Sequence, residues 1–593
     1  MELKARNEMN ADYMWDLTPI FTDDNEWKAA LNEAETAIKA LENLPGTLGQ
    51  SAESLKTALN RIYEAEFKSE RVYIYAFLKK SGDNGDAHFQ DMEARAISLI
   101  VSLQTACAFM EPEILSIPQE RLESFMTSPE LQPYRHLIDN IVRARKHTLD
   151  AECERLLAML GDAAQTPNNV FDMFESVDIR FPPIMDASGT PLTLTHASFS
   201  LFRENRDQRI RQEAFETYFG EFGKYINTLA AMYAGAVKMN CFYASAHRHE
   251  GACQAALFGN NIPLSLYDDL IDTVHGALPI MRDYLELRKQ VLGLDVLNMY
   301  DLYVPIVEDT NFSMPFDSAR DMVKAALAPL GVEYQSLLNR AFEEKWIDVY
   351  ENRGKTTGAY SIGVYGVHPY VLMNYAGKLD DAFTLAHELG HSMHSYFSDQ
   401  SQDYANHDYS IFVAEVASTV NEVLLTKYLL ANETDEKRRA YLLNHFLEGF
   451  RTTVFRQTLF AEFERKAHEM YQTGTPLTAQ GLNELYHELN ALYYAGAEIN
   501  AFTDVEWARI PHFYNAFYVY QYATGFSSAV TIADHILKTG DASGYLRFLS
   551  TGGSDYPLNE LRIAGIDLTR PETLRNAMRV FKETLEELKR ILK

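Results

Sequence analysis

The sequence predicts a mainly α-helical protein, on two observations. Apolar residues recur at three- and four-residue spacing through most of the 593 residues. Proline and glycine fall mostly between these stretches, as at Leu44-Pro45-Gly46. The chain is longer than one ordinary hydrophobic core accommodates, but a large helical protein can wrap this many residues around one deep cleft. The first predicted helices cover residues 27–44, 52–80, 86–107 and 139–160.

One stretch that interrupts the helical pattern is 179–194, IRFPPIMDASGTPLTL. It has a turn signal at 186–189 between short extended runs, which predicts a β-hairpin. We expect a domain boundary close to this hairpin. The predicted division is an N-terminal helical domain at 1–195 and a second domain at 196–593.

A second interruption, 354–377, is rich in glycine and aromatic residues. Within it, residues 368–375 are predicted to form a short strand. Pro369 near its start suits an edge strand, where a missing N–H is tolerated. From residue 380 to the C-terminus the pattern is helical again.

The acidic composition of the chain argues against some classes of binding partner. With 54 basic and 83 acidic residues, the net charge is −29, and such a surface repels phosphates. Nucleic acid and anionic membrane surfaces are therefore not expected partners. Four scattered cysteines and an N-terminus without an apolar signal region predict a soluble cytoplasmic protein.

The segment 380–397, DDAFTLAHELGHSMHSYF, predicts a helix with a metal-binding pattern. The two aspartates at its start suit a helix N-terminus. His387 and His391 lie at positions i and i+4, so both imidazoles face one side of the helix. Two imidazoles so placed bind one metal ion, and Glu388 then points toward a water on that ion.

A hydrolytic zinc needs a third protein ligand and an open position for water. The metzincin pattern is excluded, because it would have glycine and histidine where this chain has His394 and Phe397. We interpret His394 as a packing residue or as a neighbour of a ligand. The apolar stretch 411–430 carries Glu415 and Glu422, seven residues apart and so on one face. Because a buried carboxylate is costly, we expect one to bind the metal and the other to orient a ligand histidine.

At these residues the chain resembles the oligoendopeptidase F family, relatives of thimet oligopeptidase and neurolysin. The resemblance is carried by FTLAHELGHSMHSYFS followed by YSIFVAEVASTVNE. It extends upstream through GAYSIGVYGVHPYVLMNY and downstream through IPHFYNAFYVYQYATG. The N-terminal half, from WDLTPIF onward, is similar to that family's helical leader, so the likeness spans nearly the whole chain.

The resemblance implies a large helical zincin-like metallopeptidase with a deep substrate channel and a small β element near the active-site helix. The domain at 196–593 would be the catalytic one and hold one zinc ion per chain. The activity implied is that of a zinc metalloendopeptidase that hydrolyses internal peptide bonds of oligopeptides. The strand at 368–375 would pair with the substrate backbone.

Individual roles follow from the same resemblance. The third zinc ligand of the family opens an E-x-x-S-like stretch, which assigns Glu415 and leaves Glu422 to orient a ligand. The stretch 512–525 that matches the family's substrate-holding segment contains Tyr514, Tyr518, Tyr520 and Tyr522, and the alignment leaves open which of them faces the metal. Tyr520 is the first choice, to stabilise the oxyanion together with His512, and Tyr518 would bind substrate. On a regular helix Tyr518 and Tyr520 lie roughly 200° apart, so both face the metal only if the helix breaks.

Two other functions stay open from the sequence. A zinc carboxypeptidase on a similar helical fold would share the motif but need a basic group for the substrate's C-terminal carboxylate. A peptide-binding protein with an inactive motif is the second alternative. The presence of His387, Glu388, His391 and Glu415 together argues against it, because loss of catalysis would release all four.

Overall fold

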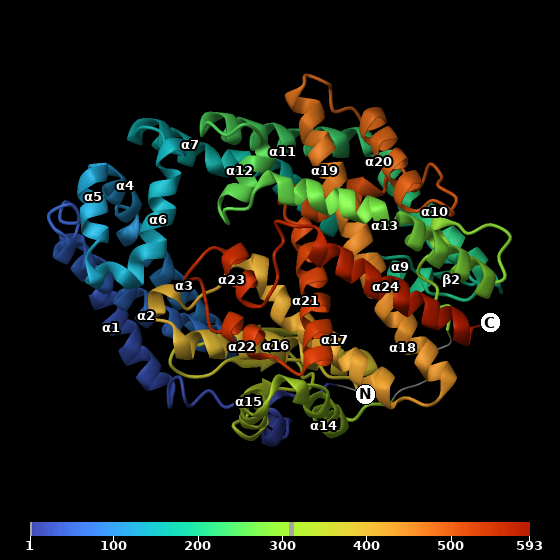
Figure 1. The fold of residues 1–593 in the computed structure, drawn as a ribbon, viewed down its shortest axis with the longest axis horizontal. Coiled ribbons are helices and arrows are strands. Elements are labelled where there is room, and N and C mark those ends of the chain that lie inside the picture. Colours follow the sequence, from blue (N-terminus) through green and yellow to red (C-terminus); the bar gives the residue numbers. More distant parts are fainter. Residues whose placement is uncertain (1–2, 308–312, 593) are drawn as a thin grey trace. The chain divides into compact units, whose positions relative to one another are not determined.

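The computed structural model describes residues 3–307 and 313–592, and helices dominate it (Figure 1). The predicted mainly α fold class is confirmed. The chain forms two compact units. Unit 1 consists of Met1–Lys146, Asn311–Tyr428 and Ile532–Ile566, and unit 2 of His147–Thr310, Leu429–Thr531 and Asp567–Lys593. Each unit thus draws on three segments of the chain, and the predicted division at residue 195 stays a prediction.

Unit 1 begins with three helices close to the predicted ones: α1 at Asp24–Ala40, α2 at Ala52–Gly82 and α3 at Ala87–Cys107. The side chains of Asp23 and Ser51 accept hydrogen bonds from the first turns of α1 and α2. Buried apolar residues of these helices form one core together with residues of the strand β5. The remaining helices of unit 1 are α4 (Met110–Ser116), α5 (Gln119–Met126), α6 (Arg135–Ala144), α14 (Phe316–Ala326), α15 (Val332–Glu343), α16 (Leu379–Ser401), most of α17 (Ile411–Asn432), α22 (Ser543–Leu549) and α23 (Pro557–Ile563).

The single helix predicted for 139–160 is wrong. The chain forms α6, a 3₁₀ turn at Arg145–His147, and then α7 at Ala151–Ala164. The break has a local cause, because the side chain of Asp150 accepts a hydrogen bond from the N–H of Cys153 at 3.0 Å and starts a new helix. Apolar spacing alone does not register such a cap.

A small sheet of three strands lies in unit 1, in the order β3-β5-β4. The strands are β3 at Ile347–Asp348, β4 at Tyr360–Ile362 and β5 at Tyr370–Leu372. β5 runs parallel to β3 and antiparallel to β4, with Ser361 opposite Val371. The predicted β element is therefore present beside the helix α16, which packs against β4 and β5.

The prediction that 368–375 forms an edge strand is wrong, because β5 is the central strand. The N–H groups of Val371 and Met373 donate to the β3 side, at 2.9 and 2.8 Å. Pro369 precedes the first residue of β5, so its missing N–H removes no bond from the sheet. The edge beside α16 is formed by β4 instead.

Unit 2 is helical, with one short hairpin. The strands β1, Ile184–Met185, and β2, Pro191–Leu192, pair antiparallel, which confirms the predicted hairpin. Its helices are α7, α8 (Thr166–Met173), α9 (His196–Arg203), α10 (Gln208–Lys224), α11 (Ile226–Ala246), α12 (Ala252–Phe258), α13 (Leu264–Val291), α18 (Glu436–Gly449), α19 (Arg456–Gln472), α20 (Ala479–Tyr493), the first part of α21 (Tyr520–Thr539) and α24 (Glu572–Ile591).

One helical segment, Ala87–Ser116, is long and apolar enough to cross a membrane by length and composition alone. Four residues of α3 within it, Met92, Ala96, Leu99 and Leu103, belong to the buried core of unit 1. A core helix of a soluble protein passes the same test, so the segment is weak grounds for a membrane span. The cytoplasmic location stays a prediction.

Candidate metal centre

Helix α16 presents the histidine motif in unit 1. Its start is held by Asp381, whose Oδ2 accepts hydrogen bonds from the N–H groups of Ala376 and Lys378 at 3.0 and 2.8 Å. Its apolar stripe is buried, and His387 and His391 follow one turn apart on a half-buried side. The predicted helix and the shared face of the two imidazoles are both present.

Helix α17 lies unusually close to α16, which brings its glutamates to the histidines. A Cβ atom added to Gly390 would lie 2.5 Å from the Cα of Ser418 and 2.7 Å from the carbonyl oxygen of Ala417. Only a glycine fits at such a contact between two backbones. The buried side chain of Asn421 donates from Nδ2 to the carbonyl oxygen of Ala386 at 2.9 Å, which fixes the register of the two helices.

Three side-chain atoms converge between these helices. The Nε2 atoms of His387 and His391 are 3.1 Å apart, and Oε2 of Glu415 lies 3.5 and 3.6 Å from them. A tetrahedral zinc ion about 2.0–2.2 Å from each atom would hold its ligand atoms roughly 3.3–3.6 Å apart. The group His387, His391 and Glu415 can therefore hold a metal ion.

Two further side chains orient these three atoms. Oε1 of Glu422 lies 2.5 Å from Nδ1 of His387, so this ring nitrogen donates and Nε2 is the atom turned toward His391 and Glu415. Ser418 donates from Oγ to Oε2 of Glu415 at 3.0 Å. Both contacts are of the kind that holds metal ligands in place from outside the coordination sphere.

The charges around the group favour a cation. Burial lowers the pKa of His387, but the hydrogen bond to Glu422 and the nearby carboxylates outweigh it and raise that pKa to about 9. Burial, with the His387 charge, lowers the pKa of His391 to about 4. Two imidazole nitrogens 3.1 Å apart repel one another unless a proton or a cation lies between them. The donor set of two imidazoles and one carboxylate fits zinc.

Glu388 follows the first histidine and is only 6% exposed. Burial raises its pKa to about 7, against the lowering effect of the His387 charge. A carboxylate with such a pKa takes up and releases a proton readily near neutral pH. The backbone carbonyl oxygen of Glu388 accepts a hydrogen bond from the Oγ of Ser392 at 2.9 Å. The Oγ of Ser392 also lies 2.8 Å from the Oγ of Ser361 on β4.

His394 is fully buried, stacked on Tyr409 with ring centroids 3.6 Å apart, and lies against Phe548. It is not part of the converging group. Its position corresponds to the packing interpretation.

Sequence reasoning missed Gly390 and Ser361. A glycine inside an apolar helical stripe indicates close packing of two backbones, so the role of Gly390 could have been predicted from the sequence. Ser361 gave no such signal, because its contact depends on where the sheet meets α16.

His512, Tyr518 and Tyr520 all lie in unit 2. The ring of His512 lies near those of Tyr518 and Tyr522, with centroids 6.5 and 6.1 Å apart, and these two tyrosines contact one another edge to face at 5.3 Å. Tyr520 is only 2% exposed and packs on Tyr267. Because α21 begins at Tyr520, Tyr518 precedes the helix and the two tyrosines have different neighbours. Their catalytic roles stay predictions.

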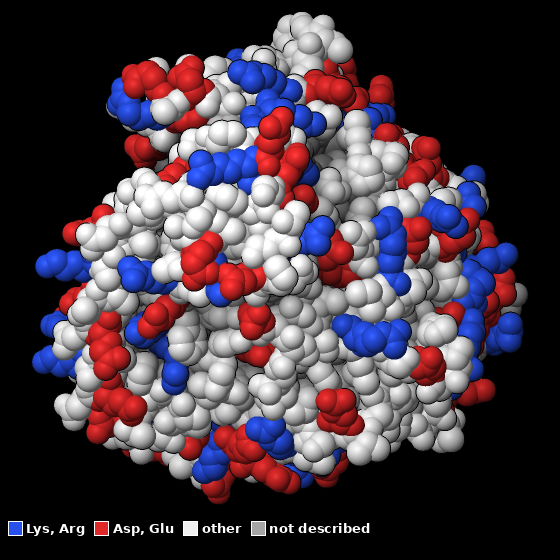
Figure 2. Space-filling model, turned by 60° about the vertical axis from the view of Figure 1, so that its left-hand side comes forward, with Lys and Arg blue, Asp and Glu red and all other residues white. Residues whose placement is uncertain are grey.

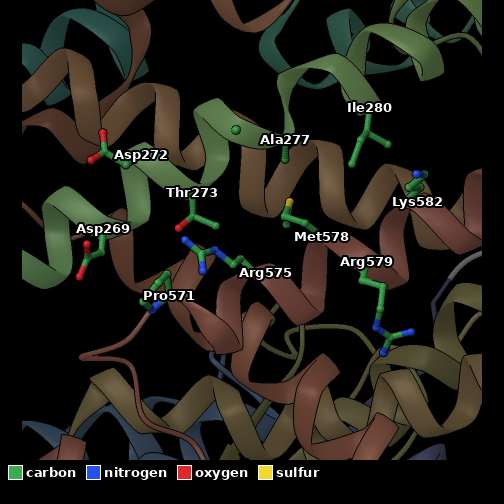
Figure 3. A pocket seen from close by; sticks show the side chains of 11 residues that line it. Asp269, Asp272, Thr273, Ala277, Ile280, Pro571, Arg575, Met578, Arg579 and Lys582 are labelled. Carbon is green, nitrogen blue, oxygen red and sulfur yellow. The ribbon is translucent and has the colours of Figure 1, made fainter.

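A groove of about 500 Å³ lies between α13 and α24 of unit 2, and the predicted site residues do not line it (Figure 3). Asp269 and Asp272 of α13 and Arg575 and Arg579 of α24 are among the residues that line it, and Arg579 pairs with Glu583 of its own helix at 2.6 Å. On the face drawn in Figure 2, acidic and basic side chains are interspersed. The expectation that nucleic acid is no partner stays a prediction.

Comparisons with known proteins point to one family. The profile of Peptidase family M3 matches residues 201–580, and that of Oligopeptidase F matches residues 113–181. The chain is 42% identical to Oligopeptidase PepF of Bacillus subtilis (strain 168), covering 100% of this chain and 89% of that protein. It is 39% identical to an oligoendopeptidase F homolog of Lactococcus lactis subsp. lactis (strain IL1403), covering 99% of both.

Solved structures agree with the sequence comparisons. A Chlamydophila abortus protein described as a peptidase has a TM-score of 0.95 at 33% identity, over 100% of both chains. Oligoendopeptidase-F from Enterococcus faecium has a TM-score of 0.73 at 36% identity, over 96% of this chain and 99% of that one. The chain therefore belongs to peptidase family M3, as an oligoendopeptidase F-type metallopeptidase that hydrolyses oligopeptides.

Proposed function

We propose that the protein is a zinc metalloendopeptidase that cuts internal bonds of oligopeptides with Glu388 as general base. One observation carries the proposal: Nε2 of His387, Nε2 of His391 and Oε2 of Glu415 converge at tetrahedral ligand spacing beside a buried carboxylate. One zinc ion per chain would be held there.

A zinc ion in this group supplies Lewis acidity, which lowers the pKa of a water and polarises a scissile carbonyl. Glu388 accepts the proton of the attacking water and later delivers it to the leaving amine. Glu422 keeps the Nε2 lone pair of His387 directed inward, and Ser418 holds the carboxylate of Glu415. These two contacts keep His387 and Glu415 in fixed positions before substrate arrives.

The edge strand β4 is the proposed backbone-binding element, in place of 368–375. Val371, which lies opposite Ser361, donates its N–H to the β3 side, so these two residues form a pair without hydrogen bonds between them. The N–H and C=O of Ser361 therefore point away from β5. An extended peptide that pairs there gains affinity with little demand on its side chains. The contact between Ser361 and Ser392 ties this strand to α16.

For the oxyanion we keep His512 and Tyr520 as proposed catalytic residues and Tyr518 as the proposed substrate-binding residue. Burial lowers the pKa of His512 below its ordinary value, which favours the neutral ring, and a neutral imidazole has one N–H to donate. The half-buried Tyr518 and Tyr522 are the tyrosines that lie beside His512. Tyr518, Tyr520 and Tyr522 can be replaced singly by phenylalanine to find the oxyanion donor. Loss of the donor hydroxyl should lower kcat, whereas loss of a hydroxyl that only packs should lower the stability of the protein.

The substrate class follows from an enclosed site, as the family resemblance implies. We propose that flexible oligopeptides enter a deep channel, whereas folded proteins do not, and that the protein acts in the cytoplasm without nucleic acid or membrane partners. A peptide of about ten residues and a long denatured protein such as reduced casein distinguish the channel from an open groove. Comparable rates per susceptible bond would refute the channel and leave the zinc chemistry standing.

The testing experiment uses a decapeptide blocked at both ends, with products identified by mass spectrometry with and without a zinc chelator. The proposal expects internal cleavage that the chelator abolishes and added zinc restores. No cleavage of the blocked decapeptide, together with cleavage of the same peptide when its C-terminus is free, would favour the carboxypeptidase alternative. Binding without cleavage by the zinc-loaded protein would favour the peptide-binding alternative.

A further inference from the structure

Unit 2 contains a group of basic residues remote in sequence from the metal motif, which we call the arginine cluster: Arg203, Arg451, Arg456 and Arg509 around Tyr303. These residues come from the end of α9, the π-helical turn Phe450–Phe455, the start of α19 and the 3₁₀ turn Glu506–Arg509. Three separate segments thus bring guanidinium groups together inside a chain of net charge −29, because the π-helical turn runs directly into α19.

Arg509 lies near the ring of Tyr218, 5.9 Å from its centroid, whereas Tyr303 is the contact that joins Arg203 and Arg451. The guanidinium carbon of Arg203 lies 3.8 Å from the centroid of its ring, and that of Arg451 lies 4.6 Å from it. Two cations on one phenol ring repel one another, and cation–π attraction contributes only about 0.5–2 kcal/mol each. The ring therefore does not account for the positive charge collected on it.

The acids nearby do not balance the charge either. Glu506 pairs with Arg456 at 2.7 Å, and Glu448 pairs with Arg451 at 2.6 Å. Glu448 also serves Arg288, at 3.1 Å. Among the residues that the structure describes, no ion pair is formed by Arg203 or by Arg509.

Hydrogen-bond donors are left over as well. Nε of Arg203, Nη1 of Arg451 and Nε of Arg509 are buried and find no acceptor among the described residues. Arg451 is only 1% exposed. A buried charge without a partner is strongly unfavourable, and each unsatisfied donor typically costs about 1–3 kcal/mol. An excess of this kind is expected where an anion is the missing partner.

The excess of positive charge also shifts the pKa values of Arg203 and Tyr303. Burial lowers the pKa of Arg203, and the charges of Arg509 and Arg456 lower it further against the raising effects of Tyr303 and Glu506. Burial raises the pKa of Tyr303, but Arg456, Arg203 and Arg451 outweigh it and bring that pKa to about 7. An arriving anion would relieve both effects.

We propose that the arginine cluster is a binding site for a small oxyanion, a carboxylate or a phosphate. Planar guanidinium groups present paired N–H donors that match the oxygens of either group. The shared chemistry has two sources: a free inorganic anion, or the C-terminal carboxylate of a peptide. Only the peptide source rests on the proposed function.

The first arm of the test measures the melting temperature of the zinc-loaded full chain in inorganic phosphate and in chloride at equal ionic strength. We expect phosphate to raise the melting temperature of the native protein, and to do so much less in Arg203→Gln and Arg509→Gln. Arg209→Gln, which removes a surface arginine paired with Glu213, is the matched control and should keep the native response. An equal rise in all four proteins would be a general salt effect.

A spectroscopic readout accompanies this arm. The ultraviolet absorbance of tyrosinate should titrate near neutral pH through Tyr303, disappear in Tyr303→Phe, and move to higher pH when phosphate is added. The second arm compares KM for two peptides that differ only in a free or an amidated C-terminus. We expect the free acid to bind about tenfold more tightly if the source is a peptide, and the difference to vanish in Arg203→Gln.

A phosphate effect without a peptide effect identifies a free anion, and the reverse identifies the substrate carboxylate. Either result that depends on Arg203 and Arg509 supports the site. No difference in either arm between the native protein and these variants would overturn it. Because the first arm requires no turnover, its result is independent of the proposed peptidase mechanism.

Discussion

Nδ1 of His387 lies 2.5 Å from Oε1 of Glu422, and this contact turns Nε2 of the same ring toward His391 and Glu415. One glutamate of α17 thus orients His387, while the other lies within 3.6 Å of both histidines. The two acids are seven residues apart, on one face of the helix.

The two glutamates are expected to differ in their effect on metal affinity. Glu422→Gln keeps an acceptor near Nδ1 but loses the charge, so zinc affinity should fall roughly 10–100-fold. Glu415→Gln removes a charged ligand and should weaken zinc further. Competition with a chromogenic chelator measures both. Loss of zinc from Glu422→Gln with retention in Glu415→Gln would mean that the two roles are exchanged.

Gly390→Ala should damage the metal centre without touching a ligand. The new Cβ would lie 2.5 Å from the Cα of Ser418, so α16 and α17 must move apart. We expect a loss of at least about 1–3 kcal/mol in stability, together with weaker zinc binding. Gly276→Ala in α13 is the control, since its Cβ meets nothing within 4 Å. Equal zinc affinity and stability in the two variants would contradict the close-packing argument.

If the substrate backbone pairs with β4, the KM of a peptide should depend on whether its backbone N–H groups are free to donate. A series of doubly blocked peptides, each N-methylated at one position, should contain one or two members with KM raised about tenfold, because methylation removes a strand hydrogen bond. The affected positions should alternate, as the outward groups of an extended strand do. A flat profile across the series would show that β4 does not bind the substrate backbone.

Glu560 in α23 predicts how stability depends on pH. It is 1% exposed, and burial raises its pKa from 4.5 to about 8. The folded state thus holds a proton that the unfolded state releases, so this contribution is complete below pH 4.5 and is lost as the pH rises through 8.

Glu560→Gln has no such proton, so it should gain stability relative to the native protein between pH 5 and 8. The expected gain is of the order of a few kcal/mol. Denaturant unfolding at several pH values measures it, with the exposed Glu586→Gln as the control. A constant difference between Glu560→Gln and the native protein over this range would contradict the assignment.

The helical class and the face shared by His387 and His391 were predictable because both depend on local spacing. The strand order was not, because β5 becomes central only when Ile347 and Asp348 pair with it, and two-residue strands leave no pattern. Whether Glu415 or Glu422 faces the metal depends on how α17 crosses α16, so spacing left both open.

The remaining differences have the same origin. The break between α6 and α7 depends on one capping side chain, Asp150, inside an otherwise helical pattern. The arginine cluster draws its members from distant parts of the sequence, from Arg203 to Arg509, so single motifs do not reveal it. Local patterns therefore predict elements, whereas contacts between elements require the structure.

The central claim is that His387, His391 and Glu415 hold a zinc ion beside Glu388 as the general base. The most direct measurement is zinc content together with turnover of a doubly blocked peptide in Glu388→Gln. Because the substitution keeps the shape and all three ligands, we expect about one zinc per chain and a turnover reduced by roughly 10²–10⁴. Near-native turnover in the zinc-loaded variant, or a native protein fully active without metal, would contradict the account.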